Sequence, residues 1–163
     1  MAFDTFLKIE GVPGESTAKG FEKQIEIYSF SWGASNPVTI GSGSGGGGAG
    51  KVSVSSFNVM KKSEASSAKL FGACCKGVHF PTAEVTMRKA GGDAGQAPFL
   101  KYKFTEVYIE SIQWSGSSGG DDSPTESISL AFGKVEIEYL KQEKDGKTAV
   151  AGQASWDVRT VST

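Results

Sequence analysis

The residues whose spacing most suggests chemistry form a glycine-rich tract at positions 41–50, GSGSGGGGAG, which Lys51 follows. Its seven glycines are Gly41, Gly43, Gly45, Gly46, Gly47, Gly48 and Gly50. They satisfy the spacing of a dinucleotide fingerprint and, with Lys51, that of a phosphate-binding loop. Both motifs need a helix directly afterwards, and the phosphate-binding loop also needs Ser or Thr after the lysine. Val52 occupies that position and opens VSVSSFNV, a segment typical of a strand. We therefore expect a flexible, exposed connection and no nucleotide cofactor.

Cysteine and histidine are too few to build a catalytic or metal site. Cys74 and Cys75 are adjacent, so they cannot form a disulfide bond that links distant parts of a fold. Their place on a helical apolar stripe favours buried small residues over a vicinal redox pair. His79 is the only histidine, and neither a zinc site nor a nucleophilic triad can be assembled around it. We expect a structural imidazole near a turn before Pro81, and no enzyme.

The acidic residues after a second glycine-rich stretch are the remaining candidate for a metal site. Asp121, Asp122 and Glu126 could hold calcium, but they lack the ordered ligand spacing of a dedicated loop. A solvated turn is the favoured interpretation. We predict no metal.

Charge argues against nucleic acid as a partner. Lys plus Arg is 17 against 18 for Asp plus Glu, a net charge of −1, so there is no global basic field. The paired cations, Lys61 with Lys62 and Lys101 with Lys103, have no interleaved aromatics to stack bases. We interpret these lysines as exposed solubility charges.

The elements that must hold these residues are mostly strands, in one β domain predicted over residues 1–163. Strands are expected at residues 3–9, 24–34, 52–60, 83–89, 99–114, 126–140 and 154–160. One helix is expected at 63–76, with Ser63 as its cap and Gly77 at its end. Its apolar stripe is Leu70, Phe71, Cys74 and Cys75.

Two of the long strands change the phase of their apolar alternation. One face carries Leu100, Tyr102 and Phe104, and the other carries Val107 and Ile109. A second slip falls near Gly133 in the strand at 126–140. A period of two cannot slip without a bulge or a change of the buried face. We therefore predict a small antiparallel β-barrel with one flanking α-helix, with a β-sandwich as the alternative.

Alternation also singles out Ser31 in the segment SFSWGAS. Ser29, Ser31 and Gly33 share one face of the strand. The opposite face carries Tyr28, Phe30 and Trp32. If the aromatic face packs inward, a small polar face is left bare, and from alternation alone Ser31 is either a solvated strand residue or a contact residue.

No apolar run approaches the roughly 20 residues that cross a bilayer, so we expect no membrane insertion. The N-terminal segment MAFDTFLKIEG places Asp4 and Lys8 where a signal peptide has its apolar region. We expect cytoplasmic synthesis without a signal peptide.

Several segments, taken in order, resemble the haemolysin-coregulated protein (Hcp) family, the tube-forming component of type VI secretion systems. They are FDTFLKIEGVPGES, SFSWGAS, GAGKVSV, GVHFP, VTMRKAGG and TESISLAFGKVEIEY, and they span essentially the whole chain. Each is weak alone, whereas their order and spacing are specific.

The resemblance implies a non-enzymatic protein with a small β-barrel and a flanking helix. It implies homohexameric rings that stack into a tube inside a contractile sheath, with spike proteins as further partners, and export from the producing cell. It also implies that effectors are carried or chaperoned in the ring lumen, with Ser31 on the lumen wall. We expect the glycine tract to contact a neighbouring ring during stacking. The alternative is a secreted carbohydrate-binding or adhesin-like module that uses Trp32, Trp114 or Trp156, although these residues also suit core or interface positions.

Overall fold

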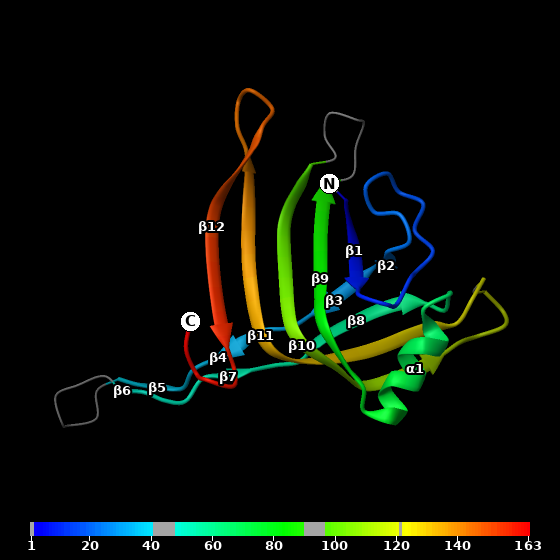
Figure 1. Ribbon diagram of the computed structural model, residues 1–163, viewed down its shortest axis with the longest axis horizontal. Helices are drawn as coiled ribbons and strands as arrows, with labels where there is room; N and C mark the ends of the chain where they lie inside the picture. Colours follow the sequence, from blue (N-terminus) through cyan, green and yellow to red (C-terminus); the bar gives the residue numbers. More distant parts are fainter. Residues whose placement is uncertain (1, 41–47, 90–96, 121) are drawn as a thin grey trace.

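The described residues form an eight-stranded antiparallel sheet that curls into a nearly closed barrel, with one helix at its side (Figure 1). The structure is a computed structural model that describes residues 2–40, 48–89, 97–120 and 122–163. The larger elements are β1 Phe3–Ile9, β8 Phe57–Lys62, α1 Ser67–Lys76, β9 His79–Lys89, β10 Pro98–Ser115, β11 Thr125–Gln142 and β12 Thr148–Asp157. The short strands are β2 Ile25–Ile27, β3 Ser29–Ser31, β4 Ala34–Ser35, β5 Val38–Thr39, β6 Gly48–Ala49 and β7 Ser53–Val54.

The barrel nearly closes at Tyr28, where the chain passes from one end of the sheet to the other. The strand order is β2-β1-β9-β10-β11-β8-β3, so the two outermost strands of this path are consecutive in the chain. Tyr28 separates β2 from β3, and its N–H donates to the Met60 carbonyl at 3.1 Å. The expectation of one strand over residues 24–34 is therefore wrong, because this segment changes its partner from β1 to β8.

The change of phase in the two longest strands is confirmed, and with it the barrel. In β10 the buried positions pass from Phe104 to Val107, and Glu106 between them has φ of 57°. In β11 they pass from Leu130 to Val135. Gly133 lies at this second change, and a Cβ there would be 2.9 Å from Nε of Arg159. The sandwich alternative is thereby replaced by a curled single sheet.

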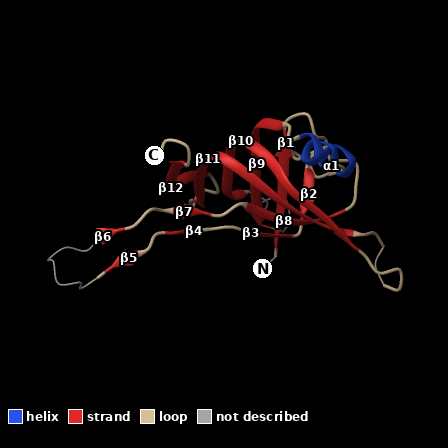
Figure 2. Cartoon of the chain, turned by 90° about the horizontal axis from the view of Figure 1, so that it is seen from below, coloured by secondary structure: helices blue, strands red, loops and turns tan. Residues whose placement is uncertain are grey.

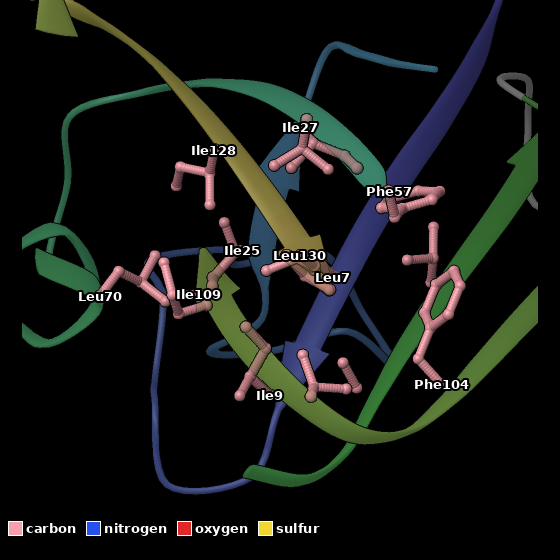
Figure 3. Packing of buried hydrophobic residues seen from close by; sticks show 14 of the residues in the cluster. Leu7, Ile9, Ile25, Ile27, Phe57, Leu70, Phe104, Ile109, Ile128 and Leu130 are labelled. Carbon is pink, nitrogen blue, oxygen red and sulfur yellow. The ribbon is translucent and has the colours of Figure 1, made fainter. Parts of the chain in front are cut away.

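The core fills the barrel with side chains from every wall (Figure 3). Phe57 from β8, Phe104 from β10 and Leu130 from β11 are fully buried there, and Leu70 closes the core from the helix. Burying a side chain of this size contributes roughly 1.5–3 kcal/mol. The core includes residues from both halves of β10 and β11, so their packing stabilises the curved shape of the sheet.

Helix α1 begins later than predicted and buries a narrower face. Ser66 occupies the N-cap position without a side-chain cap hydrogen bond, and the Ser63 N–H instead donates to the Pro124 carbonyl at 3.0 Å. Gly77 ends the helix with φ of 66°, as predicted. The expectation that Cys74 and Cys75 are both buried is wrong, since Cys75 is exposed and Cys74 is half-buried.

The position of His79 also differs from the one predicted. It is the first residue of β9, exposed, with its ring centroid 5.6 Å from that of Tyr108. Pro81 lies inside β9 and marks no turn. The strand begins four residues before the predicted position 83 because residues 79–82 pair with β10.

A buried ion cluster fastens the start of α1 to the sheet. Lys61 and Glu126 are 0% exposed, and Nζ of Lys61 lies 3.1 Å from Oε1 of Glu126 and 3.2 Å from Oε1 of Glu64. Ser67 at the helix start accepts a hydrogen bond from Lys61 at 3.1 Å and donates to Glu126. The predictions of Lys61 as a solubility charge and of Glu126 as part of a solvated turn are therefore wrong.

The charge of Glu126 is stabilised by its neighbours. Burial would raise the pKa of Glu126, but hydrogen bonds from Ser67, Ser63 and Lys61 outweigh burial and lower the pKa below the ordinary 4.5. A carboxyl whose pKa is lower in the folded state adds stability above its unfolded pKa. This contribution is lost as the pH falls through the folded value.

Replacing Lys61 by Ala is expected to lower the free energy of unfolding by about 3–5 kcal/mol, because it leaves the Glu126 carboxylate buried without its cation. Lys62 is the matched control, since it is adjacent and exposed, and Lys62→Ala should change stability by less than about 0.5 kcal/mol. Urea unfolding of both variants measures the difference. Equal midpoints would contradict the structural role of the cluster.

Candidate functional site

The candidate site is a face of small, uncharged side chains on four adjacent strands, β3, β8, β11 and β10. We call it the polar face. Strand register places its members in two rows across the sheet. The rows are Ser31, Asn58, Ser129, Ser111 and Ser29, Met60, Ser127, Gln113. Ser31 lies at the β3 end of the first row and is exposed.

The opposite side of the same strands packs into the barrel. Phe30 of β3 pairs with Val59 of β8, which pairs with Ile128 of β11. Val59 and Ile128 are 0% and 1% exposed, and Phe30 packs against this core. The predicted inward packing of Phe30 and Trp32 is confirmed, whereas Tyr28 is 57% exposed because it lies at the change of strand partner.

Asn58 connects three strands of the polar face by hydrogen bonds. Its Nδ2 donates to the carbonyls of Ser31 at 3.4 Å and Ser56 at 3.3 Å, and its Oδ1 accepts from Oγ of Ser129 at 2.5 Å. The polar groups of this row are therefore partly satisfied within the sheet, which leaves a firm surface of short side chains.

The other half of the long strands presents a different chemistry to the outside. There Lys103 of β10 pairs with Glu84 of β9 and Glu136 of β11, and Lys101 pairs with Glu138. These residues line a shallow hollow of about 320 Å³. The two rows of the polar face thus carry no charged side chain, although Glu110 and Lys62 border them, and they lie beside a strongly charged region.

A two-stranded arm projects from the barrel next to the polar face (Figures 1 and 2). It is built from β4 paired with β7 and, farther out, β5 paired with β6. Gly48 lies in β6, and the Gly50 N–H donates to the Pro37 carbonyl at 2.7 Å. The flexible, exposed connection expected over residues 41–50 stays a prediction. The other five tract glycines, Gly41, Gly43, Gly45, Gly46 and Gly47, lie outside the described residues.

The three tryptophans occupy core and surface positions. Trp32 lies among Phe57, Tyr102 and Phe104, with ring centroids 5.2–6.3 Å away. Trp156 also packs against the core. Trp114 is 44% exposed and lies 5.6 Å from the ring of Phe71 on α1. They do not form one flat aromatic platform of the kind that stacks on sugars.

Metal-ligating side chains are scattered through the described part of the chain. Over the described ranges, the structure contains no group of three or more His, Cys, Asp or Glu residues placed to hold a metal ion. Within the same part of the chain, α1 and the other described segments include no helix with the length and apolarity of a membrane span.

The described residues define a β-barrel protein with one helix and a projecting arm. Its candidate site is an exposed surface, the polar face. Residues 6–139 match the family described as type VI secretion system effector, Hcp. The chain belongs to the Hcp family of structural type VI secretion proteins. The family resemblance is therefore confirmed.

Relatives of known structure and sequence cover nearly the whole chain. Protein hcp1 of Pseudomonas aeruginosa is 39% identical over 160 residues, which is 98% of this chain and 97% of the relative. A solved type six secretion system protein superposes with a TM-score of 0.91 at 40% identity, covering 98% of both chains. Hcp1 from Salmonella typhimurium superposes with a TM-score of 0.79 at 33% identity, covering 99% of both chains.

The predicted exposure of Ser31 on its strand face is confirmed, and its role in the site stays a prediction. Most other residues of the polar face were not predicted. Asn58 and Met60 alternate with buried residues in FNVMKK, so their outward direction was available from the sequence. Their place beside Ser31 was not, because it depends on long-range register between β3, β8 and β11.

Gly50→Val is expected to disrupt the base of the arm and leave the barrel intact. A Cβ at Gly50 would lie 2.6 Å from Cγ and 2.8 Å from the carbonyl oxygen of Pro37. Gly33→Ala is the matched control, since a Cβ at Gly33 would meet nothing within 4 Å. Hydrogen exchange should become faster in residues 34–40 and 48–54 of the first variant only, with melting temperatures near that of the wild type. Unchanged exchange in Gly50→Val would contradict the strand pairing of the arm.

Proposed function

We propose that the protein is a tube subunit that assembles into hexameric rings, stacks them, and carries effectors through the lumen before export. The observation that carries this proposal is the four-stranded face β3-β8-β11-β10, which has an unpaired edge at each of its two ends. In the described structure β3 pairs with β8 alone, and β10 beyond Tyr108 pairs with β11 alone. An exposed strand edge favours pairing with another chain.

The directions of the four strands fit a closed ring. Each neighbouring pair in the order β3-β8-β11-β10 is antiparallel, so β3 and β10 run in opposite directions. Joining β10 of one copy to β3 of the next would therefore continue the antiparallel alternation across the seam. A repeated heterologous contact of this kind closes into a ring when its rotation allows.

In such a ring the polar face would form the lumen wall. The opposite side of these strands packs against the barrel core, so the polar face is the side of the joined sheet that stays free. Short uncharged side chains would leave space in the lumen, and they would not form strong ion pairs with a cargo protein. Ser31 would lie at the seam, where an effector touches two copies at once. Sheath and spike proteins would contact the assembled tube and not this face.

Light scattering at micromolar concentration is expected to give about six times the chain mass of 17.1 kDa. Amide exchange should slow on assembly at residues 29–31 and 111–115, because the two edges become hydrogen-bonded. A monomer throughout this concentration range would contradict ring formation.

Ser31→Gln is expected to keep the ring mass and to lower both effector co-purification and effector abundance in the producing cell. The larger side chain would narrow the lumen, and folding should be unaffected because Ser31 is exposed. Ser117→Gln, an equal change at an exposed position off the polar face, is the control. Undiminished effector binding by intact Ser31→Gln rings would remove Ser31 from the site, and loss of the ring would make it an assembly residue.

A further inference from the structure

We propose that Glu110 gives the polar face a preference for basic cargo, because its carboxylate pairs with lysine or arginine side chains on the surface of an effector. This inference rests on the proposed function and adds the chemistry by which the lumen selects what it carries. Glu110 lies in β10 and is exposed. It borders the row of the polar face that contains Ser111, Ser129, Asn58 and Ser31.

A bulge in β10 places Glu110 outside the regular pairing of the sheet. Ile109 pairs with Leu130 and Ser111 pairs with Ser129, so Glu110 has no partner residue on β11. Ile109 is 4% exposed and faces the core. A bulge inserts one residue into a strand and can direct its side chain away from the regular alternation. The carboxylate is therefore presented at the surface, next to the polar row.

Ser56 positions the carboxylate on the same side of the sheet as the polar face. The Ser56 hydroxyl donates a hydrogen bond to Oε1 of Glu110. Ser56 directly precedes Phe57, which is 0% exposed, so the Ser56 side chain lies on the outward side of the strand with Asn58. The Ser56 carbonyl accepts from Nδ2 of Asn58 at 3.3 Å. Glu110 is thus joined to the hydrogen-bonded residues of the polar face.

Glu110 keeps its negative charge available to a partner. None of the ion pairs found within the described ranges includes it. Lys61 and Glu126 on the neighbouring strands are 0% exposed and pair with each other. Lys62 borders the face at the other end of β8, and its spacing from Ser56 corresponds to roughly 20 Å of extended strand. That distance exceeds the Debye length of about 8 Å at physiological ionic strength, so Lys62 does not neutralise Glu110.

In the proposed ring this carboxylate would repeat once per copy, close to each seam. Glu110 lies in the part of β10 beyond Tyr108, the edge that the seam would join to β3 of the next copy. Repeated carboxylates on an otherwise uncharged wall attract a basic protein and repel an acidic one. Each exposed ion pair is weak, whereas several formed at once strengthen binding. Contacts of this kind suit a cargo that must also be released.

The first test measures how tightly a fluorophore-labelled oligolysine of about ten residues binds to assembled rings at low ionic strength. Glu110→Gln removes the charge with little change in size, and it is expected to weaken binding about tenfold at unchanged ring mass. Glu10→Gln, the same change at an exposed position just after β1, is the control and should bind like the wild type. Equal binding by Glu110→Gln and wild type would overturn the inference. Loss of the ring in Glu110→Gln would also overturn it, since Glu110 would then be an assembly residue.

A charge reversal gives a result that a purely structural role of Glu110 would not produce. Rings of Glu110→Lys should bind oligolysine more weakly than rings of Glu110→Gln. They should also bind an oligoglutamate of the same length more tightly than wild-type rings do. An unchanged preference between the two peptides in Glu110→Lys would contradict selection of cargo by this side chain.

Zero-length carbodiimide cross-linking of the oligolysine to wild-type rings locates the contact without any substitution. We expect Glu110 to be joined to a lysine of the peptide, and cross-links confined to other carboxylates would overturn the inference. Light scattering on the same sample separates this inference from the proposed function. A wild-type monomer would contradict ring formation and the cargo preference together, whereas an intact ring without cross-links at Glu110 would contradict the cargo preference alone.

Discussion

The paired change of face in β10 and β11 determines how every other element of the barrel is placed. Thr105 pairs with Lys134 and Val107 pairs with Phe132, so Glu106 and Gly133 lie opposite each other at this change. On one side of it β11 pairs with β12, and on the other β11 pairs with β8. β9 pairs with β10 along the first side and continues past the change only to Tyr108. Two strands thereby build both the charged part of the barrel and the polar face.

A glycine at 133 allows this change because it leaves room for an ion-paired side chain. Arg159 lies over Gly133 and forms an ion pair with Glu106, which lies inside β10 at the change of face. It also pairs with Asp157 at the end of β12, with 2.9 Å between Nη2 and Oδ2. The hydrogen bond from Arg159 is the largest influence on Asp157 and helps lower its pKa to about 2. The bend in the sheet is thus joined to the C-terminal segment by Arg159.

The sequence predicted the class of fold because local alternation reports which side of a strand is buried. The slips near residues 105 and 133 and the small face around Ser31 were readable in this way. The helix end at Gly77 was predicted separately, because glycine is favoured at a helix C-terminus. Lys61 and Glu126 lie in the buried phase of the alternation with Val59 and Ile128. Their burial was still not predicted, because a charged side chain is buried only with a partner, and this partnership forms where β8, β11 and α1 meet. The break at Tyr28 did leave a mark, because the inward positions pass from Ile25 and Ile27 to Phe30 and Trp32. The exchange of partner from β1 to β8 could not be predicted, because it depends on long-range pairing.

If the polar face lines a ring, the seams of that ring join β3 of one copy to β10 of the next. An electron cryo-microscopy reconstruction of the assembled protein would show both features at once. We expect six copies around a channel, with Ser31, Asn58 and Ser129 facing the channel and residues 29–31 hydrogen-bonded to 111–115 of the neighbour. A ring with the polar face on its outer surface, or with seams made by other strands, would contradict this assembly.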